Sequence, residues 1–227
     1  MIKSPFRPSD DATRLPFFIP GNAFAVVELR RTAALLSSVL NQTALSKDLG
    51  SLADEIDAAI QRYGVVADPD DPSRKIYAFE VDGYGGQYLI DDANVPSLLA
   101  LPFLGYLDAS DPIYQNTRAR ILGPRNPYWF KGAAGQGIGS PHTGLNNIWP
   151  MSIVFQALTS DDPTEIASCL RLLKTSSAGL GFMHESYDKE DPRVFTRSWF
   201  AMANSLFGAL ILRTLQLYPS VLTTLPL

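Results

Sequence analysis

Apolar side chains recur every three or four residues in two consecutive segments near the N-terminus, and this periodicity limits the folds that the chain can adopt. Residues 22–41 carry leucine and alanine at these steps, and residues 45–63 repeat the pattern up to Gly64. Each pattern predicts a helix with one buried stripe, because residues three and four apart lie on the same helix face. Since only three residues separate the two segments, we expect an antiparallel helical hairpin.

The remaining sequence predicts one β-hairpin and five further helices. The β-hairpin is expected at residues 76–90, where apolar and polar side chains alternate before a glycine-rich turn, and the preceding residues 67–75 form a polar link. The helices are expected at residues 95–107, 112–122, 145–158, 163–174 and 197–218. Residues 123–144 are predicted to form a long loop, a feature that is often functional in compact domains. The pattern therefore indicates a mainly α fold whose helical hairpins carry elaborate loops.

The composition narrows the class of protein. A chain of 227 residues with 46% hydrophobic residues is typical of one globular domain. Its formal net charge of −4 includes no basic run, which argues against a nucleic-acid partner. The uncharged, apolar run at residues 198–212 is shorter than the roughly 20 residues that cross a bilayer, so no membrane partner is expected. No secretory signal pattern follows Met1, and the single cysteine, Cys169, is predicted to be a buried apolar side chain.

The sequence offers no familiar metal, phosphate or acyl-transfer site. Its only histidines are His142 and His184, and Asp188 stands where a zinc protease would need a second histidine after His184-Glu185. No strand is predicted before the glycines of residues 135–139, and no serine lies in a Gly-x-Ser-x-Gly turn. We therefore expect neither a metal nor a cofactor.

Carboxylates in aromatic-rich loops are the remaining candidates for chemistry. Hydrolysis of a glycosidic bond uses two carboxyl groups, one to protonate the leaving oxygen and one to activate water. The candidates are Asp10, Asp11, Asp91, Asp92 and Glu185. Each has a structural alternative: the first pair could cap a turn, the second pair could cap the helix expected at residues 95–107, and the glutamate could be a solvated loop residue.

Five motifs together resemble glycoside hydrolase family 125. They are FRPSDDA (residues 6–12), IYAFEVDG (76–83), DDANVPSLL (91–99), GSPHT (139–143) and GFMHESY (181–187). That family consists of metal-independent, inverting exo-α-1,6-mannosidases built on an (α/α)6 barrel, a ring of six helical hairpins. The resemblance implies that residues 1–227 form a single catalytic domain, here a partial (α/α)6 barrel that lacks its N-terminal half.

The resemblance also implies roles for individual residues. The general acid would be Asp11 or Asp10, with Asp11 preferred by a narrow margin, and the general base would be Glu185. Five further residues would shape the subsite for the terminal mannose. These are Arg7, His142, His184, Asp92 and Asn94. The implied partners are α-1,6-linked mannosides, and mannose would leave in one displacement without a covalent intermediate.

Two other functions are compatible with the same sequence. A sugar epimerase on the same helical ring would move a proton with a pair of pocket histidines, for which only His142 and His184 are available. An inactive glycan-binding remnant would retain the motifs without turnover, as expected if half of the barrel is absent.

Overall fold

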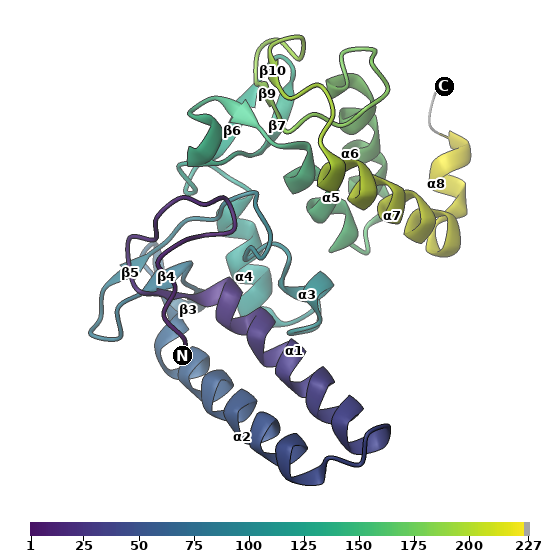
Figure 1. Cartoon of the computed structure of the whole chain (residues 1–227). Coiled ribbons are helices and arrows are strands. Elements are labelled where there is room, and N and C mark those ends of the chain that lie inside the picture. The colour runs from purple at the N-terminus through teal and green to yellow at the C-terminus, as the bar shows by residue number, and fades with distance from the viewer. Residues whose placement is uncertain (225–227) are drawn as a thin grey trace. The chain divides into compact units, whose positions relative to one another are not determined.

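The computed structural model describes residues 1–224, which form two compact units. Unit 1 comprises Met1–Ile90 and Pro96–Ala119, and unit 2 comprises Asp91–Val95 and the chain from Arg120 onward. Helices dominate both units, and all strands are short (Figure 1). The mainly α character that the sequence predicts is confirmed, whereas the single catalytic domain remains a prediction.

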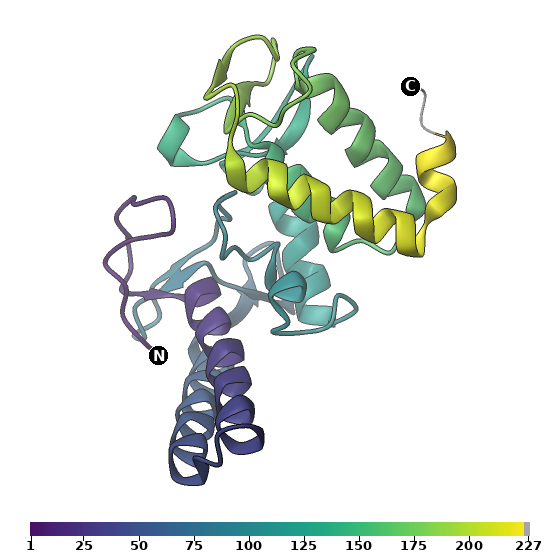
Figure 2. The ribbon, with the colours of Figure 1, turned by 45° about the vertical axis from the view of Figure 1, so that its right-hand side comes forward.

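The N-terminal hairpin is confirmed. Helices α1 (Ile19–Ser38) and α2 (Thr43–Ala59) run antiparallel, side by side in both views (Figures 1 and 2). Helix α1 begins three residues earlier than expected, because Pro20 suits a first helical turn. A single π-helical turn, η1 (Ile60–Gly64), extends α2 to the glycine that was expected to end it.

The strands of unit 1 form two small antiparallel sheets. Strands β1 (Phe17–Phe18), β4 (Glu80–Val81) and β5 (Gln87–Tyr88) pair in the order β1-β4-β5, which confirms a hairpin around the glycine-rich turn. Strands β2 (Val65–Asp68) and β3 (Asp71–Tyr77) form a second hairpin where the sequence predicted a polar link, so that prediction is wrong. The carboxylate of Asp68 accepts a hydrogen bond from the backbone N–H of Asp70 at 3.1 Å, which stabilises the reversal.

The prediction of a helix at residues 95–107 is wrong over most of its length. Only α3 (Leu101–Leu104) forms, because proline lacks the N–H that the interior of a longer helix needs, and Pro102 is therefore tolerated only in a first helical turn. Gly105, with a φ of 86°, then ends the helix. The next helix, α4 (Pro112–Ile121), is confirmed.

Unit 2 contains four helices among its described residues. They are α5 (Pro150–Leu158), α6 (Pro163–Ser176), α7 (Ala201–Leu217) and α8 (Pro219–Thr224). Asp162 caps α6 by accepting a hydrogen bond from the N–H of Thr164 at 2.8 Å, as its position before Pro163 favours. Cys169 is buried in this helix, as predicted.

Short strands replace parts of the predicted helices and loops of unit 2. The expected loop at residues 123–144 contains the hairpin of β6 (Trp129–Gly132) and β7 (Gly135–Ile138), followed by a 3₁₀ turn, η2 (Pro141–Thr143). A second sheet has the order β10-β9-β8, from β8 (Asn147–Ile148), β9 (Ser186–Asp188) and β10 (Phe195–Thr196).

Two helices of unit 2 therefore begin later than predicted. Pairing of β8 keeps residues 145–149 out of α5, which starts at Pro150. Residues 197–200 stay outside α7, because Arg197 has a φ of 47° and Phe200 bonds back to Met183. Among residues 1–224, none of the helices combines the length and the apolar character that crossing a bilayer requires.

Substitution of Thr117 by valine is expected to destabilise unit 1. The hydroxyl of Thr117, which is 1% exposed, accepts the hydrogen bond of the Tyr77 backbone N–H at 2.8 Å and so ties α4 to β3. Valine has the same shape but leaves this N–H unpaired, which costs about 1–3 kcal/mol of unfolding free energy. Urea unfolding followed by circular dichroism measures the change.

The exposed Thr32 of α1 supplies the matched control, and Thr32→Val should change the free energy of unfolding by less than about 0.5 kcal/mol. Equal effects of the two substitutions would contradict the role given to this hydrogen bond.

Candidate active site

The acidic pair near the N-terminus lies at the end of a tight loop, residues 6–12. The N–H of Asp10 donates to the carbonyl oxygen of Arg7 at 3.0 Å, and the N–H of Arg7 donates to that of Asp11 at 2.8 Å. Pro8 takes the second position of this turn, which its fixed φ favours, and Asp10 has a φ of 66°. This is the left-handed position that follows a type I turn in a hairpin loop with a bulge, where glycine, asparagine and aspartate are tolerated. The backbone conformation thus explains why an aspartate suits position 10.

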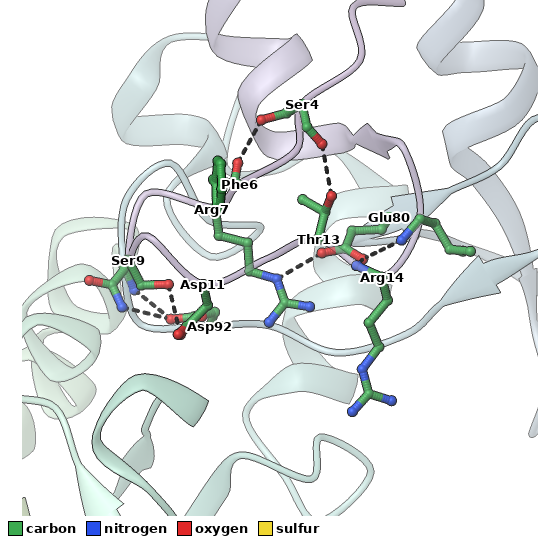
Figure 3. A network of polar contacts seen from close by, with 11 residues as sticks. Ser4, Phe6, Arg7, Ser9, Asp11, Thr13, Arg14, Glu80 and Asp92 are labelled. Atoms are coloured by element: carbon green, nitrogen blue, oxygen red, sulfur yellow. Dashed lines mark hydrogen bonds and ion pairs between the residues drawn. The ribbon is translucent and has the colours of Figure 1, made fainter.

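A buried carboxylate on β4 anchors this loop. Glu80 is fully buried and accepts hydrogen bonds from Arg7 Nε at 2.7 Å, the Arg14 N–H at 2.8 Å and the Leu15 N–H at 3.0 Å (Figure 3). The guanidinium of Arg7 also lies over the ring of Tyr88, with its carbon 5.7 Å from the ring centre. A buried ion pair is favourable only when further hydrogen bonds satisfy its atoms, and the two backbone donors supply them here.

The two aspartates of the loop differ in their surroundings. Asp11 is half-buried and its Oδ2 accepts a hydrogen bond from the hydroxyl of the buried Ser9 at 3.0 Å (Figure 3). Asp10 is exposed. The carboxyl group of Asp11 is therefore held in one orientation by a side chain of its own loop.

Glu185 lies immediately before β9 and is only 5% exposed, so the expectation of a solvated loop acid is wrong. Its N–H lies 3.3 Å from the carbonyl oxygen of Thr196 and 3.4 Å from that of Arg197. Arg197 Nε lies 3.3 Å from the Oε1 atom of Glu185. The hydroxyls of Ser186 and Thr196, 2.7 Å apart, join the same two segments. Both the backbone and the carboxylate of Glu185 are thus fixed by a segment ten or more residues away.

The neighbouring His184 is 1% exposed and is fixed on two sides. Its Nδ1 lies 2.9 Å from the carbonyl oxygen of Ser198, which can only accept, so Nδ1 carries the proton. Its ring stacks on that of Phe195, with centres 4.0 Å apart and an interplanar angle of 8°. Nε2 is buried and, in the part of the chain that the structure describes, has no hydrogen-bond partner. In the neutral ring this nitrogen is an acceptor.

Residues 195–200, which we call the cradle segment, hold His184 and Glu185 in place, and sequence reasoning missed them. The N–H of Phe200 donates to the carbonyl oxygen of Met183 at 3.0 Å, so the pairing continues past β10. Asn204 adds hydrogen bonds to both backbone groups of Met183. The available signal was weak: four of the six residues, Phe195, Thr196, Trp199 and Phe200, are aromatic or β-branched, which favours a strand over a helix.

Three further candidates meet in unit 2. The Oδ1 atom of Asp92 accepts hydrogen bonds from the N–H and side-chain amide of Asn94 at 3.0 and 2.9 Å. The Asn94 amide also lies 3.2 Å from the hydroxyl of Ser140, which accepts the N–H of His142. No helix begins directly after Asp91 and Asp92, since α3 starts only at Leu101, so the helix-capping alternative is wrong. His142 is exposed and its ring lies edge-on to that of Trp149.

The arrangement suits acid–base chemistry in which carboxyl groups, and not histidines, transfer the protons. Asp11 is held by a hydrogen bond from Ser9, and Glu185 is held by backbone hydrogen bonds and an ion pair. The two histidines differ in exposure, and His184 Nδ1 is committed to a carbonyl oxygen. Among residues 1–224, no three histidine, cysteine, aspartate or glutamate side chains group so that they could hold a metal ion.

Comparison with solved structures first identifies the fold. A bacterial glucoamylase complexed with acarbose is 13% identical, with a TM-score of 0.66 over 88% of this chain and 33% of its own. At this identity the likeness concerns the fold alone, which is (α/α)6-barrel-like. A Streptococcus pneumoniae protein, described as one of a family of metal-independent alpha mannosidases and solved as a non-productive complex with alpha-1,6-mannobiose, is 41% identical. Its TM-score is 0.92, over 95% of this chain and 51% of its own.

Comparison of sequences identifies the family. The meiotically up-regulated gene 157 protein of Schizosaccharomyces pombe is 50% identical over 223 residues, which cover 98% of this chain and 43% of that protein. The chain thus spans about half the length of these relatives. The sequence profile of the metal-independent alpha-mannosidases (GH125) matches residues 1–212. The chain belongs to this family, glycoside hydrolase family 125.

Proposed function

We propose that this chain contributes both catalytic carboxyl groups of an inverting exo-α-1,6-mannosidase, which releases terminal mannose from glycans. The observation that carries the proposal is the 41% identity to the S. pneumoniae protein that was solved with alpha-1,6-mannobiose. Because the chain spans about half the length of its relatives, the activity is proposed for the catalytic domain to which both units belong. We further propose that the hairpins α1–α2 and α5–α6 are parts of an (α/α)6 barrel, which the fold likeness to the glucoamylase supports.

The proposed reaction is a single displacement. Asp11 donates a proton to the glycosidic oxygen while Glu185 takes a proton from a water molecule, whose oxygen attacks the anomeric carbon from the opposite side. The bond from this carbon to the leaving oxygen breaks as the bond to the water oxygen forms, so the released mannose is the β-anomer. The mechanism requires the two carboxyl groups to act from about 6.5–9.5 Å apart, with the water between Glu185 and the sugar.

The loop geometry favours Asp11 over Asp10 as the acid. Asp10 is accounted for by its left-handed backbone and is exposed, whereas the carboxyl of Asp11 is half-buried and oriented by Ser9. The side chain of Arg7 is paired with Glu80, so we propose that Arg7 positions the loop of residues 6–12, which carries the proposed acid.

The subsite for the terminal mannose is proposed to involve the polar groups of unit 2. They are His184, His142, Asp92 and Asn94. Of these, the buried Nε2 of His184 is an acceptor that a sugar hydroxyl could satisfy.

Hydrolysis of α-1,6-mannobiose tests the activity and the stereochemistry together. The purified protein is incubated with the disaccharide, and proton NMR follows the anomeric signals before mutarotation equilibrates them. We expect β-mannose to appear first, because a single displacement inverts the anomeric carbon. Early α-mannose would indicate a retaining mechanism, and no mannose at all would contradict the proposed activity.

Matched substitutions of the adjacent aspartates identify the acid. Asp11→Asn is expected to lower kcat by about 10²–10⁴-fold, because the amide has no acidic proton to donate. Asp10→Asn should leave kcat within about threefold, since asparagine also tolerates the left-handed conformation. Initial rates on α-1,6-mannobiose give both values. If the two effects are exchanged, Asp10 is the acid.

Replacement of Glu185 by glutamine separates catalysis from binding. Glutamine keeps the shape and can still accept a hydrogen bond but cannot take the proton of water, so kcat should fall by about 10²–10⁴-fold while affinity for the disaccharide is retained. Isothermal titration calorimetry measures the affinity. Glu190→Gln is the control, because Glu190 is exposed and its described contacts are a hydrogen bond from the Ala133 N–H to Oε2 and an ion pair of Oε1 with Lys189 at 3.9 Å. Binding without turnover in the parent protein as well as the variant would favour the glycan-binding remnant instead.

A further inference from the structure

We infer that Arg197 is a positioning residue that orients the carboxylate of Glu185 for removal of a proton from water. The inference rests on the proposed function, because it assumes that Glu185 is the general base. Arg197 lies outside the motifs that relate the chain to its family, and its role follows from its contacts, its backbone conformation and its burial.

The ion pair joins two groups of very different exposure. The Glu185 side chain is 7% exposed and that of Arg197 is 61% exposed, with Nε 3.3 Å from Oε1. A carboxylate taken out of water needs a compensating charge or donors, and the guanidinium supplies the charge from the solvent side. Since Oε1 faces the guanidinium, we assign Oε2 to the attacking water.

The backbone of Arg197 is unfavourable for its residue type. Its φ of 47° lies in the left-handed region, which glycine adopts freely and which a long side chain rarely adopts. This conformation lets the carbonyl oxygens of both Thr196 and Arg197 face the N–H of Glu185. Glycine would serve the backbone better, so the presence of arginine at this position points to a role for the side chain.

The guanidinium is also held from a second side. Its central carbon lies 5.6 Å from the centre of the Phe200 ring, a cation–π contact. Phe200 is itself fixed by the hydrogen bond to Met183. With the carboxylate and the ring as two supports, the guanidinium can hold Oε1 in one direction although most of its side chain faces water.

A second arginine of the same connection provides a comparison. Arg193 pairs with Asp191 at 2.8 Å, but their side chains are 80% and 36% exposed, and they belong to the turn between β9 and β10. An exposed pair of this kind contributes little and contacts no candidate residue. Arg193 is therefore a matched control for removal of a guanidinium from this part of the chain.

The experiment compares Arg197→Met, Arg197→Gly, Arg197→Lys and Arg193→Met in steady-state hydrolysis of α-1,6-mannobiose, with Glu185→Gln beside them. We expect Arg197→Met to lower kcat by about 10- to 100-fold with KM within about threefold, because a misplaced base slows the chemical step without weakening binding. Arg197→Gly should lose as much, although glycine fits the backbone and preserves folding. Arg197→Lys should restore part of kcat, and Arg193→Met should change neither constant.

Each of the other outcomes overturns the inference in a recognisable way. An unchanged kcat in Arg197→Met, with Glu185→Gln inactive, removes the positioning role but leaves the proposed function in place. A raised KM with unchanged kcat makes Arg197 a substrate contact. Full activity in Arg197→Gly would mean that a loss of kcat in Arg197→Met comes from the backbone conformation and not from the missing guanidinium. Full turnover in Glu185→Gln contradicts the proposed function itself and the inference with it.

Discussion

The carboxylate of Glu80 is the constraint on which the N-terminal part of the chain depends. Residues 1–16 contain no regular element, so their order comes from hydrogen bonds within the segment and from bonds to distant residues, and three of the latter end on this one buried side chain. The carboxylate neutralises Arg7 and satisfies two backbone N–H groups that would otherwise be unpaired. Since Arg7 begins the turn that ends at Asp11, the position of Asp11 is set by strand β4, about 70 residues further along the chain.

Unit 2 fixes its carboxylate in a similar way. Glu185 also lies on irregular backbone and is held by a distant short segment, the cradle segment, through backbone and side-chain contacts. Asp11 is oriented by the hydroxyl of Ser9 in its own loop, and Glu185 is oriented by residues of the cradle segment. Rigid placement by surrounding hydrogen bonds is what acid–base groups require, because their efficiency depends on alignment with the proton that they transfer. The helices carry these loops but contribute none of the carboxyl groups.

Elements whose signals are local could be predicted from the sequence, and elements that depend on distant pairing could not. Helices α1, α2 and α6 follow from apolar periodicity, and Gly64 ends the helical segment of α2 and η1 as expected. The hairpin β6–β7 and the late start of α7 depend on partners that periodicity does not reveal. At the site, the resemblance pointed to Asp11 and Glu185, but the burial of Glu185 and its pairing with Arg197 required coordinates. A charged residue at the predicted start of a helix gave no sign that its backbone is left-handed.

The loop of residues 6–12 and the cradle segment differ in which residue adopts the unfavourable left-handed conformation. In the loop of residues 6–12 the two tasks belong to neighbours: Asp10 adopts the left-handed conformation, and Asp11 carries the carboxyl group that is proposed as the acid. In the cradle segment both tasks fall on Arg197, whose backbone directs two carbonyl oxygens to Glu185 and whose guanidinium meets the carboxylate. Residues that tolerate the left-handed conformation, such as glycine and asparagine, carry no positive charge, and lysine carries the charge without the planar guanidinium that lies over the Phe200 ring. Position 197 therefore admits fewer replacements than position 10, because no other side chain meets both demands.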